Sequence, residues 1–268
     1  MEISLNGKKL LLSSPLSLRA LQEQYCPDAD VFIYNGFQTD EDLPLQDGDT
    51  VVLIRRGELP SEEQLESMMA ARHTPFVHER VKKAKVGIAG LGGLGSNIAV
   101  MLARTGIGEL VLADFDLVEP SNLNRQHYFI SHLGQYKTQA LQEQIRQINP
   151  FIQVKTHTVR LTAQNAAEIF SGCQVICEAL DRPQSKAELV AAVLEGLPQA
   201  KVVAASGMAG YGSANEIETR RKLSRLYLCG DLVSEAQPGQ GLMAPRVAVC
   251  AGHQANMVLR LLLGMDEP

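Results

Sequence analysis

Short apolar runs alternate along most of the chain with longer stretches in which apolar residues recur at helical spacing. The runs predicted to be strands are 85–89, 108–113, 152–159, 175–181 and 201–205. The stretches predicted to be helices are 98–103, 136–148, 187–194 and 248–263. Strands that alternate with helices indicate an α/β fold, with a mostly parallel sheet covered by helices on both faces. The glycine-rich stretch 207–245 is predicted to be irregular and to face a substrate.

The first 58 residues follow a different pattern, which indicates a small sheet with one helix. Met1–Leu5 alternates apolar and polar side chains, and Asn6-Gly7 supplies a tight hairpin turn. The further predicted elements are a strand at 8–13, a helix capped by Ser17, and strands at 31–34 and 50–54. This order, with the turn Asp47-Gly-Asp49 before the last strand, resembles the ubiquitin-like β-grasp domain of ThiS-type sulfur carriers.

A sulfur carrier of that type ends in a free Gly-Gly tail, whose carboxylate is the reactive group. Here the last strand runs into Arg55–Pro60 and the chain continues, so a peptide bond stands where the carboxylate would be. We therefore expect that this copy is not adenylated itself and serves as a docking or regulatory module.

A glycine-rich turn, Gly90-Leu-Gly92-Gly93-Leu-Gly95, directly follows the predicted strand 85–89 and opens a helix. Strand, glycine turn and helix together are typical of a nucleotide phosphate site on a Rossmann-like sheet. Gly90 can adopt the tight turn, Gly92 leaves room for a phosphate, and Gly95 allows the helix to pack against the strand. The free amides and the positive dipole end of the helix then face the phosphates. A purely structural tight turn is the alternative.

Acidic residues follow two of the predicted strands, at the edge where open α/β sheets bind ligands. Asp114 and Asp116 follow the run 108–113, about 20 residues past the glycines, where a ribose hydroxyl is normally held. Asp181 ends the run 175–181 at the same edge. Taken singly, Asp114 and Asp181 could be ordinary strand-end carboxylates.

The order of these motifs resembles that of the ThiF/MoeB family, the ubiquitin-activating-type adenylyltransferases. The resemblance covers nearly all of residues 65–264. Its motifs are Gly90–Gly95, Asp114-Phe-Asp116, Asn122-Leu-Asn-Arg125-Gln126, Lys137, Ile148-Asn149-Pro150, Asp181, Met243–Val247 and His253–Ala255. It implies an ATP-dependent enzyme that converts the C-terminal glycine of a separate, Gly-Gly-tailed ThiS-like sulfur carrier to an acyl-adenylate and releases pyrophosphate. The implied pathway is thiamine or related sulfur-transfer biosynthesis.

The same resemblance implies a role for each polar residue of these motifs. Arg125 and Lys137 would place cations on the triphosphate, and Asp181 would bind Mg²⁺. The other implied cofactor contacts are Asp114 to the ribose, and Asp116, Asn122, Gln126, Gly90, Gly92, Gly93 and Gly95 to the phosphates. Adenylation needs cations and a metal more than a general base, because charge accumulates on the phosphates. Taken singly, Lys137 could be an exposed helix lysine and Arg125 a surface salt-bridge partner.

Residues 59–84 are predicted to link the β-grasp domain, 1–58, to the nucleotide-binding domain, 85–268. Ser61 begins a helix in this link, and its apolar residues stand at the spacing of a packed connecting helix. These residues are Leu65, Met68 and Met69.

In the ThiF/MoeB family an arginine upstream of the first strand reaches across a dimer to the partner's ATP. The resemblance implies this role for Arg72, with Arg80 as the alternative, although Arg72 could instead be solvent-exposed. A homodimer is therefore expected, with apolar surface of the region 207–264 contributing to it.

The composition, 45% hydrophobic and 21% charged over 268 residues, is typical of a soluble globular protein. The net charge of −5 and the lack of a basic run argue against a nucleic-acid partner. We expect no membrane association, because no apolar run reaches spanning length and the amino terminus shows no signal-peptide pattern. Five cysteines at irregular spacing do not form a disulfide framework, and they favour a cytoplasmic location.

Many members of this family bind a structural zinc through two Cys-x-x-Cys pairs. Here Leu226 stands in place of the first thiolate of Leu226-Tyr-Leu-Cys229, so no zinc site is expected. Cys229 is the candidate for a covalent link to the carrier, or it is a small buried residue. Cys173 and Cys177, on or beside a predicted strand, are expected to pack in the core.

Two other functions remain open. The glycine motif alone is compatible with an NAD-dependent oxidoreductase, which leaves Arg125, Lys137 and Asp181 without a role. A non-catalytic adaptor that binds partners through its β-grasp domain fits residues 1–58, but it does not account for the phosphate-binding residues.

Overall fold

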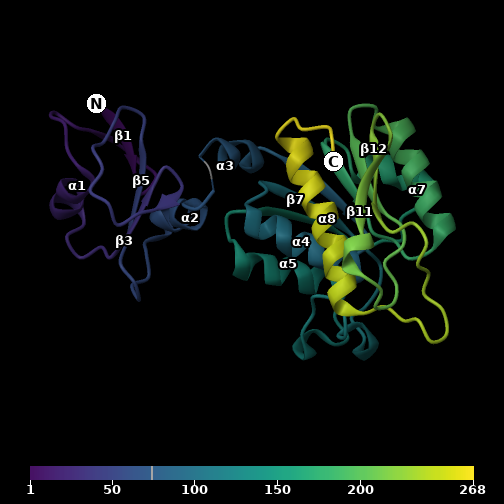
Figure 1. The fold of residues 1–268 in the computed structure, drawn as a ribbon. Coiled ribbons are helices and arrows are strands. Elements are labelled where there is room, and N and C mark those ends of the chain that lie inside the picture. The colour runs from purple at the N-terminus through teal and green to yellow at the C-terminus, as the bar shows by residue number, and fades with distance from the viewer. Residues whose placement is uncertain (74) are drawn as a thin grey trace. The chain divides into compact units, whose positions relative to one another are not determined.

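The computed structural model describes residues 1–73 and 75–268, which divide into two compact units, Met1–Glu79 and Arg80–Pro268. Thr74, inside the predicted linker, lies outside the described residues. Each unit is built around a sheet of its own, as Figure 1 shows. Helix α3 (Pro75–Lys82) spans the boundary between the units.

The first unit contains the predicted small sheet and the helix that follows it. Its elements are β1 (Glu2–Leu5), β2 (Lys8–Leu11), α1 (Leu18–Tyr25), β3 (Val31–Tyr34), β4 (Phe37–Gln38), β5 (Thr50–Ile54) and α2 (Glu62–Ala70). The strand order is β2-β1-β5-β3-β4, in which only the neighbours β1 and β5 are parallel. Asn6 and Gly7 form the predicted turn with φ of 47° and 81°. The Ser17 side chain caps α1, accepting the Ala20 N–H at 3.3 Å.

The sheet of the first unit is covered on both faces. One face packs against α1 around Leu21. On the opposite face Ile33 and Val52 pack with Met68 and Ala71, at the end of α2. The helix that the sequence predicts as a packed connection therefore covers the second face of the β-grasp sheet.

The second unit is a mostly parallel α/β sheet, as predicted. Its elements are β6 (Lys85–Ala89), α4 (Gly93–Thr105), β7 (Glu109–Ala113), η1 (Pro120–Asn122), η2 (Ile130–His132), α5 (Lys137–Ile148), β8 (Gln153–His157), α6 (Ala163–Ile169), β9 (Val175–Glu178), α7 (Pro183–Gly196), β10 (Lys201–Ala205), η3 (Ala214–Glu216), β11 (Glu218–Leu223), β12 (Leu226–Gly230) and α8 (Ala244–Leu262). The strand order is β11-β12-β10-β9-β6-β7-β8, in which β11 runs antiparallel to its neighbour. Helices α4, α5 and α8 pack on one face, and α6 packs with α7 on the other (Figure 1).

Two predictions for the second unit are wrong, and each error has a physical reason. The stretch 207–245 is not irregular throughout, because β11 and β12 form an antiparallel hairpin inside it. β11 lies at the edge of the sheet with mostly exposed side chains, so its charged sequence carries no apolar strand pattern. β9 ends at Glu178, and Asp181 lies in the loop that follows rather than at the end of the strand.

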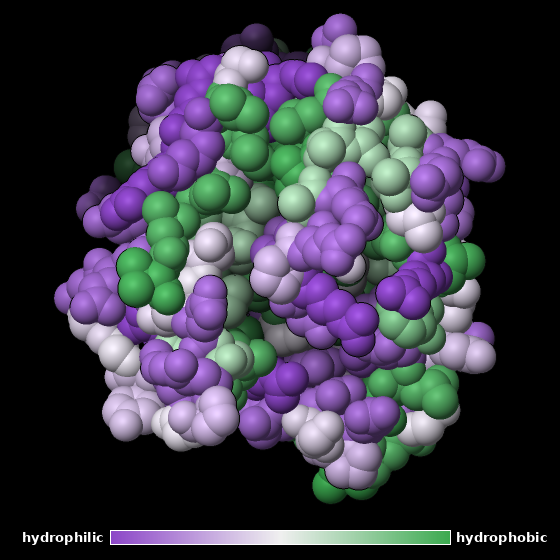
Figure 2. All heavy atoms as spheres, turned by 90° about the vertical axis from the view of Figure 1, so that its right-hand side faces the viewer, coloured by the Kyte–Doolittle hydropathy of each residue, from purple (hydrophilic) through white to green (hydrophobic). Residues whose placement is uncertain are grey.

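The apolar face of α8 is used inside the second unit. Val247, Ala251, Ala255 and Val258 are buried there, where α8 packs against α4 and the sheet. Exposed apolar side chains of the region 207–264 lie elsewhere. They are Tyr211, Leu223, Val233 and Met243. On the face drawn in Figure 2, hydrophobic side chains form several patches that hydrophilic ones separate. Among the described residues, no helix combines the length and the apolar character needed to cross a bilayer.

Candidate active site

The chain changes direction across the sheet at the central strand β6. From β6 it proceeds to β7 and β8, and it then crosses back to β9 on the other side of β6. Ala89 pairs with both Ala113 and Glu178, so the loops after β6, β7 and β9 begin at the same level. Ligands of open α/β sheets bind at such a switch point, outside the carboxyl ends of the strands. The candidate site therefore lies at this edge.

The glycine loop after β6 has the geometry that its sequence predicts. Gly90 has φ of +88°, and a Cβ there would lie 2.8 Å from the Ala179 carbonyl oxygen. A Cβ at Gly95 would lie 1.8 Å from the Gly90 carbonyl oxygen, so only glycine lets α4 begin this close to the loop. Beside Gly92, an added Cβ would meet only Gln126 Nε2 among the described residues, at 3.8 Å. This space beside Gly92 can accept a ligand, and the first amides of α4 have no acceptor within the helix.

The segment 125–128 lies along the glycine loop. Arg125 Cγ is 3.6 Å from the position that a Cβ at Gly93 would occupy. The His127 N–H donates to Ser96 Oγ at 2.9 Å. These contacts bring the arginine motif and the glycine motif together, as a shared nucleotide site requires.

Two buried polar atoms beside the glycine loop have no hydrogen-bond partner within the described part of the chain. They are Arg125 Nε and Gln126 Oε1, and Gln126 is only 8% exposed. The Arg125 guanidinium also donates through Nη1 to the Ser121 carbonyl at 3.1 Å and to Asn124 Oδ1 at 2.8 Å. Because buried polar groups are nearly always hydrogen-bonded, this unpaired donor and acceptor fit a polar ligand.

Asp114, which follows β7, is hydrogen-bonded to the glycine loop. Its Oδ2 accepts the Leu91 N–H at 2.6 Å, and its Oδ1 accepts the Asp116 N–H at 2.8 Å. Burial raises the pKa of this carboxyl, although its backbone donors and Lys137 oppose the rise. A carboxylate can accept about four hydrogen bonds, so acceptor capacity remains for a ribose hydroxyl.

Lys137, at the start of α5, is bonded to another predicted site residue. Its Nζ lies 2.9 Å from Asp116 Oδ2, and the two side chains are 6% and 48% exposed. The Lys137 N–H also donates to the Asp116 carbonyl at 3.0 Å. Asn122, in η1 between β7 and α5, is buried, and its Oδ1 accepts the Glu119 N–H at 3.1 Å.

Asp181 is exposed in the loop between β9 and α7, at the same edge of the sheet. Within residues 1–73 and 75–268, no group of three or more His, Cys, Asp or Glu side chains gathers to hold a metal ion. Mg²⁺ does not require such a group, because it binds through one or two carboxylates together with phosphate oxygens. If a phosphate binds at the glycine loop, an exposed carboxylate at this edge of the sheet fits Mg²⁺.

Comparison with known families agrees with this geometry. The ThiF family model matches residues 66–268, which is most of the chain. The chain belongs to the ThiF family. Residues 1–57 match the model of ThiS-like ubiquitin, which accounts for the small sheet of the first unit.

Two relatives of this ThiF-family chain carry the names of adenylyltransferases. The "Adenylyltransferase and sulfurtransferase UBA4" of Saccharomyces cerevisiae is 33% identical over 194 residues, which cover 69% of this chain and 43% of the yeast protein. The "Probable adenylyltransferase/sulfurtransferase MoeZ" of Mycobacterium tuberculosis is 38% identical over 123 residues, or 45% and 31% of the two chains. The chain thus spans less than half of these relatives.

A solved structure shows the same fold as the ThiF-family unit. The E. coli tRNA N6-threonylcarbamoyladenosine dehydratase TcdA, in complex with ATP, superposes with a TM-score of 0.68 at 22% identity. The match covers 77% of this chain and 98% of the TcdA chain.

A buried ion pair in the ThiF-family unit escaped prediction. Glu178, at the end of β9, is 0% exposed, and Lys186 Nζ lies 2.9 Å from its Oε1 and 2.8 Å from its Oε2. Burial raises the pKa of the Glu178 carboxyl, against the effect of Lys186. Gln254 of α8 donates to the backbone carbonyls of Glu178 and Val203, both at 3.0 Å. The signal in the sequence is an ionisable residue at the end of an otherwise apolar strand.

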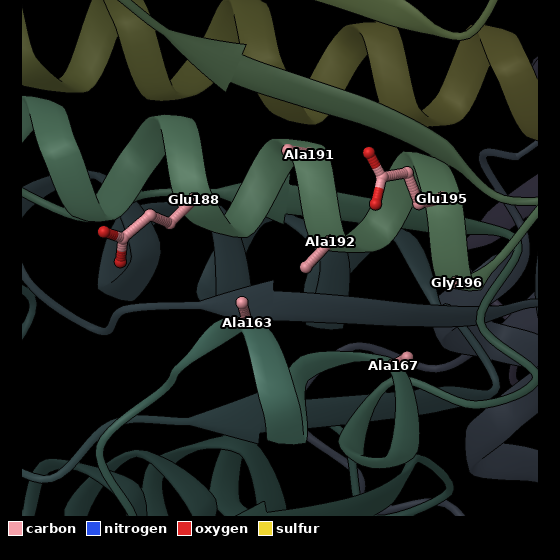
Figure 3. A pocket seen from close by; sticks show the side chains of 7 residues that line it. All are labelled: Ala163, Ala167, Glu188, Ala191, Ala192, Glu195 and Gly196. Carbon is pink, nitrogen blue, oxygen red and sulfur yellow. The ribbon is translucent and has the colours of Figure 1, made fainter.

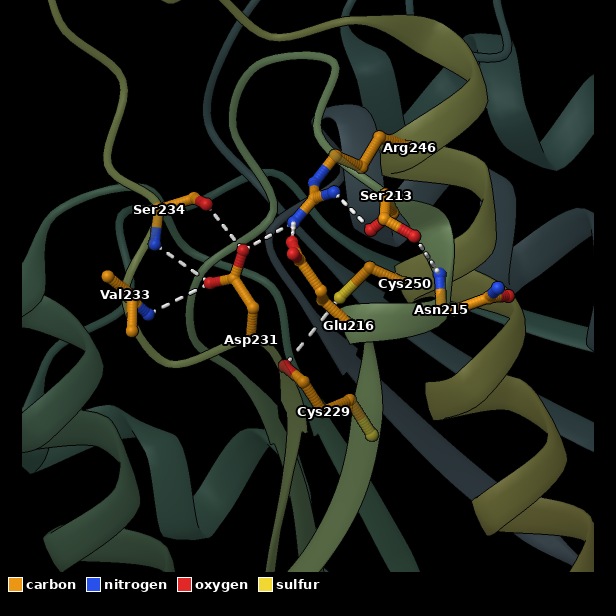
Figure 4. A network of polar contacts seen from close by, with 9 residues as sticks. All are labelled: Ser213, Asn215, Glu216, Cys229, Asp231, Val233, Ser234, Arg246 and Cys250. Carbon is orange, nitrogen blue, oxygen red and sulfur yellow. Dashed lines mark hydrogen bonds and ion pairs between the residues drawn. The ribbon is translucent and has the colours of Figure 1, made fainter.

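A second network, drawn in Figure 4, fixes the loop after β12 to the start of α8. Arg246 is 4% exposed and pairs with Asp231. Asp231 also accepts the N–H groups of Val233 and Ser234, each at 2.8 Å. Burial alone would raise the pKa of the Asp231 carboxyl, but hydrogen bonds from the Ser234 hydroxyl, from the Ser234 and Val233 N–H groups and from Arg246 hold it well below its usual range. We assign this network a structural role.

The cysteines of the second unit are buried. Cys229 is 0% exposed, and burial raises the pKa of its thiol to about 11. A cysteine attacks a carrier through its thiolate, and the raised pKa disfavours the thiolate of Cys229. Cys229 therefore fits the alternative of a small buried residue rather than that of a covalent link to a carrier. Cys173 and Cys177 lie in the core, as predicted. Leu226, which stands in place of a zinc ligand, packs against the same core.

The two candidate arginines for a dimer contact are both engaged. Arg72 belongs to the first unit, where its Nη1 donates to Gln38 Oε1 at 3.2 Å. Arg80 belongs to the second unit, where its Nη1 donates to the Leu263 carbonyl at 2.7 Å.

A hollow between α6 and α7, drawn in Figure 3, does not fit a nucleotide. Its lining consists of small and acidic residues: Ala163, Ala167, Glu188, Ala191, Ala192, Glu195 and Gly196. Phosphates would be repelled by the two glutamates, and the described residues that line the hollow include no cation.

Proposed function

We propose that this ThiF-family protein is an ATP-dependent adenylyltransferase. The observation that carries the proposal is the contact of segment 125–128 with the glycine loop, where Arg125 Nε and Gln126 Oε1 are buried and have no partner among the described residues. Lys137, at the start of α5, supplies a second cation and pairs with Asp116, which follows β7. The ATP complex of TcdA, which has this fold, and the names of the yeast and mycobacterial relatives support the nucleotide and the reaction class.

In the proposed reaction a carboxylate oxygen of the substrate attacks the α-phosphorus of ATP. A bond forms between these two atoms, the bond to the bridging oxygen breaks, and pyrophosphate leaves with that electron pair. Arg125 and Lys137 stabilise the negative charge that grows on the leaving phosphates. Because Asp116 lies 2.9 Å from Lys137 Nζ, it keeps this lysine in place for the phosphates.

Asp181 would hold Mg²⁺ together with the phosphate oxygens, and the ion would neutralise charge on the leaving group. Asp114 would accept a ribose hydroxyl, and Gln126 would meet the phosphates beside Gly92. The glycine amides at the start of α4 would donate to the same phosphates.

The proposed substrate is the C-terminal glycine of a separate Gly-Gly-tailed, ThiS-like sulfur carrier, in thiamine or related sulfur-transfer biosynthesis. Both curated relatives are named adenylyltransferase and sulfurtransferase, which fits sulfur transfer. The protein's own β-grasp domain, residues 1–58, continues through Arg55–Pro60 and has no free tail. It therefore serves as a docking or regulatory module, joined by the linker 59–84 to the catalytic domain 85–268.

The working form proposed here is a cytoplasmic homodimer. The five cysteines are free thiols, which fits a reducing compartment. Exposed apolar residues in the region 207–264, such as Tyr211 and Val233, provide surface for the second copy. Arg72, with Arg80 as the alternative, would exchange its present partner for the ATP of the other protomer.

ATP–pyrophosphate exchange tests the proposal. We expect exchange that requires the protein, Mg²⁺ and a carrier that ends in Gly-Gly, and that stops when the carrier lacks its last two glycines. ATP binding without exchange under any of these conditions would favour the non-catalytic adaptor. Tight binding of NAD without ATP binding would overturn the proposal in favour of an oxidoreductase.

A further inference from the structure

Tyr128 is a buried residue that the proposed chemistry does not use. It is 5% exposed, and it follows the arginine motif by a few residues. Its hydroxyl donates to the Leu91 carbonyl oxygen at 2.8 Å, inside the glycine loop. A phenol that donates to this loop has a direct route to the phosphate-binding amides.

The backbone of Leu91 is held from two sides. Its N–H donates to Asp114 Oδ2 at 2.6 Å, and its carbonyl accepts from Tyr128. The Leu91 side chain is 0% exposed, and the preceding Gly90 N–H donates to the Ala113 carbonyl at 2.9 Å. The peptide that follows Leu91 therefore has little freedom to turn.

The orientation of that peptide decides where the Gly92 amide points. A trans peptide is planar, so the N–H of Gly92 points opposite to the carbonyl of Leu91. Because Tyr128 holds the carbonyl, the Gly92 N–H points away from Tyr128. On the Cβ side of Gly92 the described residues contribute only Gln126 Nε2, at 3.8 Å, and Gln126 Oε1 is buried without a partner there.

We propose that Tyr128 is a positioning residue that aims the Gly92 amide at a phosphate of the bound nucleotide. Tyr128 itself touches neither ATP nor the carboxylate substrate, and it acts through the Leu91–Gly92 peptide. This inference rests on the proposed ATP site. Without the hydroxyl, the Leu91 carbonyl loses its donor and the peptide can turn.

The variant Tyr128→Phe removes only this hydroxyl. We expect its dissociation constant for ATP to rise about tenfold, the loss typical of one hydrogen bond to a charged group. Its affinity for adenosine should stay unchanged, because adenosine has no phosphate to meet the Gly92 amide. The matched control is Tyr227→Phe, since the Tyr227 hydroxyl is also buried and has no partner among the described residues.

Calorimetry with ATP and with adenosine, alongside thermal unfolding of each variant, separates the outcomes. The proposal is overturned if Tyr128→Phe binds ATP as tightly as the wild type. It is also overturned if adenosine binding falls by the same factor, or if Tyr227→Phe loses as much ATP affinity, because either result would indicate a general effect on the fold. A wild-type protein that binds no ATP would instead remove the proposed function.

A second measurement does not depend on the folding of Tyr128→Phe. In wild-type protein labelled with ¹⁵N-glycine, the Gly92 amide resonance should shift on addition of ATP and remain in place with adenosine. The resonance can be assigned from its loss in Gly92→Ala, for which the space is open because, among the described residues, the added Cβ meets only Gln126 Nε2 at 3.8 Å. A Gly92 amide resonance whose chemical shift does not change at saturating ATP would contradict the proposal.

Discussion

Lys137 and Asp116 form an ion pair with an Nζ–Oδ2 distance of 2.9 Å, in which the lysine is nearly buried and the aspartate is half exposed. The aspartate thus remains in contact with water, while the lysine is held at the edge of the sheet where the glycine loop begins. In the proposed site this pair would orient a cation for the phosphates without burying a second charge.

Replacing the cation of this pair should slow the reaction strongly while the fold is retained. We expect Lys137→Met to slow ATP–pyrophosphate exchange by about two orders of magnitude, since one contact to developing charge is worth about 3 kcal/mol. Methionine fills the same buried space, and Asp116 can be hydrated, so the unfolding midpoint should change little. The control is Lys155→Met, which breaks a 2.8 Å contact to Glu109 on the half-exposed surface of β8. Equal exchange rates in both variants would remove Lys137 from the mechanism.

Asp181→Asn keeps the shape of the side chain and removes its charge. We expect near-normal ATP binding, an unchanged unfolding midpoint, and exchange reduced by about two orders of magnitude. The reason is that the loss of the carboxylate charge removes more stabilisation from a metal-held transition state than from the ground state. The Mg²⁺ concentration needed for half-maximal exchange should also rise. Glu195→Gln, on the following helix, is the control. Wild-type exchange in Asp181→Asn would exclude the metal role, and an unfolded variant would make the role structural.

Glu178 and Asp231 should give stability contributions with opposite pH dependence. Burial raises the pKa of Glu178 above its ordinary 4.5, so the folded state binds this proton more tightly than the unfolded chain. Its contribution to the free energy of unfolding therefore decreases as the pH rises from about 4.5 through the raised pKa. The pKa of Asp231 is held below its ordinary 3.8, so its contribution is present above that pH and is lost as the pH falls below it.

Denaturant unfolding between pH 4 and pH 8 measures the Glu178 contribution, and Asp231, whose contribution is lost only below this interval, serves as the comparison. In Glu178→Gln the free energy of unfolding should decrease less as the pH rises. Lys186 loses its partner in this variant but can be hydrated, because its side chain is 21% exposed. Asp231→Asn should lower stability across the whole range and leave the alkaline slope as in the wild type. An unchanged slope in Glu178→Gln would show that its carboxyl does not titrate in this interval.

Met68 tests whether α2 is an integral part of the first unit. Met68→Asp would place a charge against Ile33 and Val52, and we expect the unfolding free energy of that unit to fall by about 2 kcal/mol. Met69→Asp is the matched control, because Met69 is 37% exposed. If the two variants unfold alike, α2 contributes little to the β-grasp unit.

Local sequence patterns predict the parts of the site that local geometry determines. The positive φ of Gly90 and the contact of Gly95 with the Gly90 carbonyl follow from a strand, a tight turn and a helix in direct succession. The pairing of Lys137 with Asp116 could not be predicted in this way, because it depends on how the end of β7 meets the start of α5. The same is true of Tyr128 and Leu91, which are far apart in the chain.

Elements whose sequence reflects solvent rather than the core also escaped prediction. β11 is charged because its side chains are exposed at the sheet edge, so the hairpin with β12 has no apolar signature. Conversely, the apolar residues of α8 suggested a surface for a second copy, whereas they are buried against α4 and the sheet. An apolar pattern shows that a face is covered, but it does not show by what.

Label transfer from ATP tests the central claim most directly. The protein, Mg²⁺ and a Gly-Gly-tailed carrier are incubated with ATP labelled either at the α-phosphate or at the γ-phosphate, and the carrier is then isolated under acid conditions. The account predicts that the α-label appears on the carrier in a bond that hydroxylamine cleaves, and that the γ-label leaves in pyrophosphate. Transfer of the γ-label to the carrier, or no transfer of either label by a protein that binds ATP, would contradict it.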